Sequence, residues 1–263
     1  MIRKEMNPPV RAILFDLEGT LYFKGALLPG VLDVLRSVSA AGIQRRFLTN
    51  SDSKSSRQMV AELAAIGLEV PVNEVFTAAT AGLTFLRQRD DNRCFPLLPA
   101  ALQAEFSSFI DRSGRVDYVV VGDVRESVTY ENLNQAFRHL RAGARLLALQ
   151  RGRYFVRADG EYLDTGGFVQ LLEYASGQAA LLMGKPSPTF FELALRDIGS
   201  TPSETLVIGD DLSTDIAGAH AIGARSVLVR TGKYDRNATT GLRPPSAELD
   251  SIAELPGLLA RSL

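Results

Sequence analysis

The first residues that could do chemistry are two carboxylates at the end of a predicted strand. Asp16 and Glu18 follow the apolar run at residues 10–15, and Gly19 permits a tight backbone turn directly after them. An i, i+2 pair leaving a strand can aim both carboxylates at one point, so that one attacks an electrophile while the other moves protons. The alternative is an ordinary polar turn at the end of a strand.

A second acidic cluster follows the apolar run at residues 205–208. Its three members are Asp210, Asp211 and Asp215. Clustered carboxylate oxygens beside a strand suit Mg²⁺, which prefers carboxylates, water and substrate phosphate as ligands. The alternative is capping, because residues 213–215 open the predicted helix that follows.

Polar groups that suit a phosphate follow two further strands. Thr49, Asn50 and Ser51 offer a hydroxyl, an amide and backbone N–H groups, although such a tripeptide also serves as a turn or a helix cap. Lys185 lies between a glycine and a proline, a rigid setting for a cation that could neutralise charge on a transferring phosphoryl group. A solvated loop lysine is the alternative interpretation.

These residues come together only if a parallel sheet gathers the carboxyl ends of its strands at one edge. Short β-branched runs alternate with amphipathic stretches along most of the chain, which predicts an α/β protein with a Rossmann-like, doubly wound parallel sheet. The predicted strands are 10–15, 44–48, 75–77, 94–97, 118–121, 146–149, 154–157, 180–183, 205–208 and 226–229. The predicted helices are 31–41, 57–66, 131–142, 168–175, one that begins at 187 and one that ends at 222.

The alternation breaks the chain into a discontinuous core and an insertion. We expect residues 1–82 and 182–263 to form the catalytic core, and residues 83–181 to form an inserted α/β cap domain that determines substrate specificity. Residues 236–246 are predicted to be a surface loop.

Composition excludes several classes of protein. With 29 basic and 30 acidic side chains the formal net charge is −1, so the field that general nucleic-acid or anionic-membrane binding requires is absent. The one cysteine, Cys94, forms no intramolecular disulfide and is expected to fill space in the core. No apolar stretch is long enough for a membrane span and the first residues lack a secretory signal, so we expect a cytoplasmic protein.

Taken together, the four motifs resemble those of the haloacid dehalogenase-like hydrolase superfamily in order and in strand context. The resemblance implies that Asp16 is a nucleophile that forms an aspartyl-phosphate, and that Glu18 is the acid/base residue. It implies that Lys185 stabilises charge. The implied phosphate-binding set is Asp16, Leu17, Glu18, Thr49, Asn50, Ser51 and Lys185, and the implied Mg²⁺ set is Asp16, Glu18 through its carbonyl, Asp210 and Asp215.

An α/β cap inserted between the second and third motifs is typical of subfamily IIA of that superfamily. Segments 130–137, 152–155, 172–175 and 230–234, together with Gly209-Asp210-Asp211, resemble the branch that contains phospholysine phosphohistidine inorganic pyrophosphate phosphatase. The resemblance implies a Mg²⁺ cofactor, a small phosphorylated substrate and a possible homodimer formed through the cap.

Glu18 departs from the family pattern, which usually has aspartate two residues after the nucleophile. The added methylene moves the proton donor, and a displacement of ~1 Å can cost on the order of 10²-fold in rate. The sequence therefore predicts a Mg²⁺-dependent phosphatase, with a weak or inactive phosphate-binding regulator as the alternative. A haloalkanoic acid dehalogenase has no use for three metal-site carboxylates, and a receiver domain carries its paired acids early in the chain rather than at Asp210 and Asp211.

The predicted cap contains a run of arginines that could meet an anionic leaving group: Arg145, Arg151, Arg153 and Arg157. Solvated surface side chains are the alternative, since alternation along 153–157 exposes some of them. His139 and His220 lie in predicted helices without ligand-like spacing, and we assign them no role.

Overall fold

A computed structural model describes residues 8–111, 113–125, 128–157, 159–234, 241 and 243–260. The chain folds into two compact units. Unit 1 comprises Met1–Thr49, Met59–Phe76 and Lys185–Leu263, and unit 2 comprises Asn50–Gln58 and Thr77–Gly184. Most of the predicted loop at 236–246 lies outside the described residues.

Unit 1 is built on a six-stranded sheet with the order β14-β13-β12-β1-β4-β5. The strands are β1 (Ala12–Asp16), β4 (Gln44–Thr49), β5 (Val75–Thr77), β12 (Thr205–Gly209), β13 (Arg225–Val229) and β14 (Ala247–Leu249). β1 pairs in parallel with both β12 and β4. The next strands along the chain, β4 and β5, lie on one side of β1, and the later strands β12, β13 and β14 lie on its other side. The topological switch point, where open α/β sheets bind ligands, therefore lies between β1 and β12.

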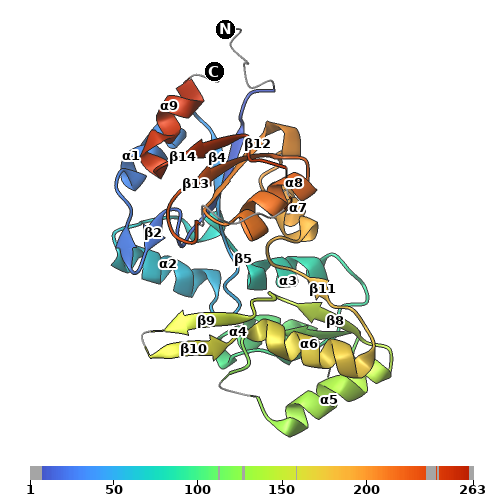
Figure 1. The fold of residues 1–263 in the computed structure, drawn as a ribbon. Coiled ribbons are helices and arrows are strands. Elements are labelled where there is room, and N and C mark those ends of the chain that lie inside the picture. The colour runs from blue at the N-terminus through green and yellow to red at the C-terminus, as the bar shows by residue number, and fades with distance from the viewer. Residues whose placement is uncertain are drawn as a thin grey trace. The chain divides into compact units, whose positions relative to one another are not determined.

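Helices cover both faces of this sheet because its strands are apolar on both sides. Figure 1 shows α1 (Val31–Ala40) and α9 (Leu255–Ala260) on one side, with α7 (Pro188–Asp197) and α8 (Ala217–Ala221) on the other. Ile13 and Phe15 of β1 pack into the same core as the buried faces of α1 and α9. Unit 1 also contains α2 (Ser56–Ala65), which begins in unit 2, the π-helix η4 (Leu212–Ile216) and the hairpin strands β2 (Tyr22–Phe23) and β3 (Ala26–Leu27). Its short 3-10 helices are η1 (Val72–Glu74), η3 (Pro202–Glu204) and η5 (Ile252–Glu254).

Unit 2 has its own four-stranded parallel sheet with the order β11-β8-β7-β6. The strands are β6 (Cys94–Leu97), β7 (Tyr118–Val121), β8 (Arg145–Ala148) and β11 (Leu181–Leu182), and β9 (Tyr154–Arg157) forms an antiparallel hairpin with β10 (Gly160–Leu163). Its helices are α3 (Ala78–Arg87), α4 (Ala100–Phe106), α5 (Tyr130–Arg141) and α6 (Thr165–Ser176).

The α/β class with a parallel, Rossmann-like core is confirmed. The sequence analysis did not predict α3, α4, β10, β14 or the β2–β3 hairpin, and the boundary it placed after residue 82 falls inside α3. The apolar residues of α3 are nearly all buried, and Thr80, Thr84 and Arg87, at helical spacing, form a narrow polar stripe on its remaining side.

Cys94 is buried in β6, and burial raises the pKa of its thiol to about 12. No helix among the described residues is long and apolar enough to cross a membrane.

The contact between α7 and α8 gives a test of this packing. A Cβ at Gly218 would lie 2.0 Å from Cε2 of the buried Phe191. We expect Gly218→Ala to lower the free energy of unfolding by about 1–3 kcal/mol through overpacking. Ala221→Leu, at an exposed position of the same helix, should change it by less than about 0.5 kcal/mol. Urea denaturation of both variants measures the difference, and equal losses would contradict this account of the helix contact.

Candidate functional site

Asp16 is the last residue of β1 and is 7% exposed, at the carboxyl end of the central strand. The Thr20 hydroxyl donates to Asp16 Oδ2 at 3.2 Å. Between them Gly19 adopts φ +97°, a left-handed conformation that lets the chain turn back at once. Leu17 is buried and its carbonyl accepts from residues 20–22, while Glu18 is exposed beside the same turn.

Lys185 places its ammonium group between two carboxylates of unit 1. Its Nζ donates to Asp16 Oδ1 at 2.5 Å and to Asp215 Oδ1 at 2.7 Å. Burial lowers the pKa of Lys185, but the charges and hydrogen bonds of the two aspartates outweigh it, so the pKa lies above its usual value. The lysine therefore stays charged although it is 5% exposed. Lys185 thus lies directly beside the Asp16 carboxylate.

Asp210 follows β12, which is paired with β1, and is held by the loop after β13. Its Oδ2 accepts from the Lys233 N–H at 2.5 Å. A Cβ at Gly19 or at Gly232 would lie 2.1 Å from the same oxygen, so two glycines in left-handed conformations form a cradle that a side chain would fill. Burial, followed by the charge of Asp16, raises the pKa of Asp210 to about 7.

Three acids of this site have the donor atoms and spacing of a metal site. Asp16, Asp210 and Asp215 are buried, and each offers one oxygen within 4.8 Å of the others. Burial raises the pKa of Asp215 to about 7, with Lys185 lowering it and Asp16 raising it. Three carboxylates against one ammonium leave two negative charges, which a divalent cation with hard oxygen ligands would neutralise. The residues present therefore fit Mg²⁺.

Asp211, by contrast, serves as a helix cap. Its Oδ1 accepts from the N–H and the hydroxyl of Ser213, at 2.7 and 2.6 Å, at the start of η4. Asp215, one turn further on, reaches Lys185 instead. Helix capping thus describes Asp211, whereas Asp215 remains a candidate metal ligand.

The predicted phosphate-binding residues divide between the two units. Thr49 is the last residue of β4, whose Leu48 is the register partner of Asp16, so Thr49 extends past the carboxyl end of the neighbouring strand. Asn50 and Ser51 belong to unit 2. A Cβ at Gly184 would lie 2.8 Å from Asn50 Oδ1, which places the Asn50 amide against the backbone directly before Lys185.

Three residues of the site were not predicted from the sequence: Thr20, Thr231 and Gly232. The Thr231 hydroxyl donates to the Gly19 carbonyl at 2.5 Å and so ties the loop after β13 to the turn after β1. The signal that could have identified Thr231 and Gly232 is their position just past a strand of the sheet, the same signal that identified Asp16 and Asp210.

The arginines of the predicted cap differ in their environment. Arg151 pairs with Glu173 of α6 at 2.5 Å, and Arg145 lies over the Tyr118 ring at 5.8 Å. Arg153 is exposed, and the side chain of Arg157 lies outside the described residues. His139 packs on Phe95 and His220 lies 3.3 Å from the Ser226 hydroxyl, positions that give neither histidine a metal.

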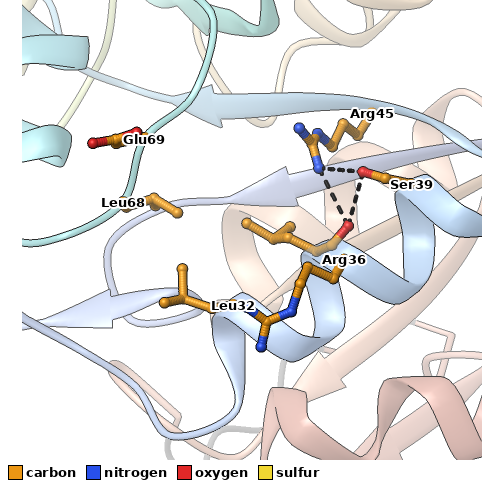
Figure 2. A pocket seen from close by; sticks show the side chains of 7 residues that line it. Leu32, Arg36, Ser39, Arg45, Leu68 and Glu69 are labelled. Carbon is orange, nitrogen blue, oxygen red and sulfur yellow. Dashed lines mark hydrogen bonds between the residues drawn. The ribbon is translucent and has the colours of Figure 1, made fainter.

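A cavity of about 350 Å³ in unit 1 lies away from these groups (Figure 2). It is lined by residues of α1, by Arg45 of β4 and by Leu68 and Glu69. Arg45 donates to Ser39 Oγ at 2.8 Å and to Glu74 at 2.7 Å, at the amino-terminal end of β4, whereas Thr49 is at its carboxyl end. No residue that the sequence analysis selected lines this cavity.

Comparison with known proteins places these motifs in a family. Residues 13–109 match the family described as haloacid dehalogenase-like hydrolase, and residues 182–255 match one described as HAD-hydrolase-like. The chain is 37% identical over 243 residues to haloacid dehalogenase-like hydrolase domain-containing protein 2 of Mus musculus, covering 90% of each chain.

Two further similarities concern phosphatases. The chain is 37% identical over 232 residues to phospholysine phosphohistidine inorganic pyrophosphate phosphatase of Xenopus laevis, covering 86% of this chain and 85% of that protein. The structure of a p-nitrophenyl phosphatase from Archaeoglobus fulgidus superposes with a TM-score of 0.86 at 26% identity, covering 95% of this chain and 100% of that one.

The glycine cradle around Asp210 can be tested by stability. Gly19→Ala would place a methyl group against Asp210 Oδ2, whereas Gly25→Ala, also at positive φ, meets nothing within 4 Å. We expect Gly25→Ala to cost about 1–2 kcal/mol of unfolding free energy from backbone strain alone. Gly19→Ala should cost about 1–3 kcal/mol more because Asp210 must move. Equal losses in chemical denaturation would show that the cradle is not close-packed.

Proposed function

The chain belongs to the haloacid dehalogenase-like hydrolase family, as a phosphatase of subfamily IIA, and from this membership we propose that it works with Mg²⁺ through a covalent aspartyl-phosphate on Asp16. The observation that carries the proposal is the Asp16 carboxylate itself. It ends the central strand, it is bonded to a buried ammonium group, and two more buried carboxylates lie within metal-ligand distance of it.

Asp16 performs the first displacement. Its carboxylate oxygen forms a bond to the substrate phosphorus while the bond from phosphorus to the leaving-group oxygen or nitrogen breaks in line with it. The Thr20 hydroxyl and Lys185 Nζ hold the carboxylate, so the nucleophile is oriented before the substrate arrives.

Glu18 carries the protons. It donates one to the leaving group in the first step, and in the second it accepts one from the water that attacks the aspartyl-phosphate, which releases phosphate and restores Asp16. Glu18 is exposed at the turn after β1, a position from which it can exchange protons with solvent. This exposure favours the phosphatase over the inactive-regulator alternative.

Lys185 and the residues that follow β4 bind the phosphate. Lys185 is held charged by Asp16 and Asp215, so it can neutralise negative charge on the phosphoryl oxygens. Thr49, Asn50 and Ser51 supply hydroxyl, amide and backbone groups for the same oxygens. Any contact from Leu17 would come through its backbone N–H, since its side chain is in the core.

The metal ligands are Asp16, Asp210 and Asp215, with the backbone carbonyl of Glu18. Mg²⁺ bound there would reduce the repulsion between the anionic nucleophile and the phosphate dianion. The loop after β13 supports this role because Lys233 and the two cradle glycines fix one oxygen of Asp210.

Substrate choice belongs to unit 2 in this proposal. The named relatives act on phospholysine, phosphohistidine, pyrophosphate and p-nitrophenyl phosphate, so we include both P–O and P–N substrates of small size. Of the cap arginines, we assign the exposed Arg153 to the anionic leaving group, because Arg151 pairs with Glu173 and Arg145 lies over the Tyr118 ring. A homodimer formed through the cap is part of the same proposal.

Asp16→Asn tests the nucleophile. The amide cannot form an acyl phosphate, so Mg²⁺-dependent release of phosphate from p-nitrophenyl phosphate should fall to background. Asp211→Asn is the matched control, since asparagine can also cap η4, and it should keep wild-type activity. Full activity in Asp16→Asn, measured by a phosphate-release assay, would refute the proposed mechanism.

Glu18 variants test the acid/base assignment. Glu18→Gln cannot transfer a proton, and we expect kcat to fall by about 10²-fold or more while KM changes little. Glu18→Asp keeps the acid and should retain turnover. Steady-state kinetics across a pH series measures both, and equal kcat values for Glu18→Gln and the wild type would remove Glu18 from the mechanism.

A further inference from the structure

A buried carboxyl group close to the phosphate-binding residues has no part in this chemistry. Asp52 is 6% exposed, and it lies two residues after Asn50 in the segment that folds with unit 2. Ionised carboxylates are rarely buried unless they are paired or hydrogen-bonded, because burial removes their hydration. The buried carboxyl group of Asp52 must therefore be stabilised by specific contacts.

The principal contact of Asp52 is with the start of α6. The Thr165 hydroxyl donates to Asp52 Oδ2 at 2.6 Å, and Thr165 is itself buried. The Asp123 N–H points to the Asp52 carbonyl at 3.4 Å. A Cβ at Gly122 would lie 2.9 Å from that carbonyl oxygen, so the backbone directly after β7 leaves no room beside Asp52.

The Thr165 hydroxyl is available for this contact because another side chain caps α6. Asp164 Oδ1 accepts from the Thr165 N–H at 2.8 Å and from Gln150 Nε2 at 2.8 Å. The capping bond and Gln150 hold the first residue of the helix in place. Thr165 is thus a rigid donor rather than a helix cap.

The surroundings of Asp52 destabilise its ionised form relative to its protonated form. Burial raises the pKa of Asp52 to about 7, the Thr165 hydrogen bond lowers it, and Asp164 and Asp123 raise it. Arg125 also faces this cluster, but its guanidinium pairs with Asp123. A carboxyl group in this setting depends strongly on its hydroxyl donor.

We propose that Asp52 is a positioning residue for phosphate binding: through Thr165 it anchors Asn50 and Ser51 to unit 2. The inference rests on the proposed function, in which those two residues hold phosphate oxygens. The Asn50 side chain packs against the Gly184 backbone, and the Asp52–Thr165 hydrogen bond holds the backbone two residues further along the chain. Loss of the bond loosens the segment that carries Asn50 and Ser51, and it weakens phosphate binding whatever the leaving group.

The experiment is calorimetric titration of inorganic phosphate into the full-length, Mg²⁺-loaded protein, which needs no turnover. Thr165→Val removes the donor and keeps the shape, and it should weaken phosphate affinity by about fivefold, the effect of one hydrogen bond. Thr165→Ser should restore the affinity. KM for p-nitrophenyl phosphate and for a second phosphate ester should rise by the same factor, with kcat nearly unchanged.

Thr129→Val is the matched control, because Thr129 caps α5 of the same unit through the Asn132 N–H. It should lower the melting temperature and leave phosphate affinity unchanged. Unchanged affinity in Thr165→Val, equal weakening in Thr129→Val, or no rescue by Thr165→Ser would each overturn the inference while the proposed function stands. Absence of phosphate binding to the wild-type protein would overturn both.

Asp52→Asn provides a second variant and a pH signature. The amide oxygen can still accept from Thr165, so phosphate affinity should be retained, and its loss would count against the anchor. In the wild type the folded pKa of about 7 exceeds the ordinary 3.8, so folding takes up a proton and stability falls as pH rises between these values. The part of the fall in melting temperature between about pH 4 and pH 7 that comes from Asp52 should be missing in Asp52→Asn. If the variant and the wild type show the same dependence of melting temperature on pH, the buried state of Asp52 is contradicted.

Discussion

The site depends on one buried ammonium group. Lys185 Nζ lies between Asp16 and Asp215 with almost no access to water, and the attraction of those two carboxylates is what keeps it charged. Breaking a buried ion pair by removing one partner leaves an uncompensated charge, which typically costs about 3–5 kcal/mol. Lysine and aspartates therefore constrain one another, and in the proposed mechanism the nucleophile cannot be oriented independently of the group that neutralises the phosphate.

The same balance explains the backbone around Asp210. One lysine cannot neutralise three acids, so the site favours an additional positive charge, and burial together with the neighbouring acids raises the pKa values of Asp210 and Asp215. Holding such acids close together requires rigid neighbours. The parallel pairing of β1 with β12 fixes their separation. Lys233 and Gly232 in the loop after β13, together with Gly19 in the turn after β1, fix the direction of Asp210.

Much of this arrangement could be predicted because it depends on local patterns. Apolar runs gave the strands, and the rule that ligands bind at the carboxyl ends of parallel strands selected Asp16, Lys185 and Asp210. Residue type and spacing alone could not separate the roles of Asp211 and Asp215, since both precede or open a helix, although the family resemblance selected Asp215 for the Mg²⁺ set. Only the path of η4 decides that one caps the helix while the other turns to Lys185.

Other features could not be predicted because their partners are distant in the chain. Thr231 meets Gly19 across 212 positions, and Thr165 meets Asp52 across 113. A lone threonine after a strand or at the start of a helix has many ordinary uses, so its type says nothing about its partner. Helix α3 was missed although its polar residues Thr80, Thr84 and Arg87 recur at helical spacing, so its sequence did carry a helical pattern.

The placement of Asn50 and Ser51 has a mechanistic consequence. The nucleophile, the lysine and the metal acids belong to unit 1, whereas these two phosphate-binding residues fold with unit 2, which also carries the exposed Arg153. In the proposed function, groups that select the leaving group and two of the residues that hold the phosphate thus fold within the same unit. A substrate whose leaving group fits unit 2 poorly should therefore also lose phosphate contacts. Specificity would then appear in kcat as well as in KM, because the same misfit changes how the phosphorus is presented to Asp16.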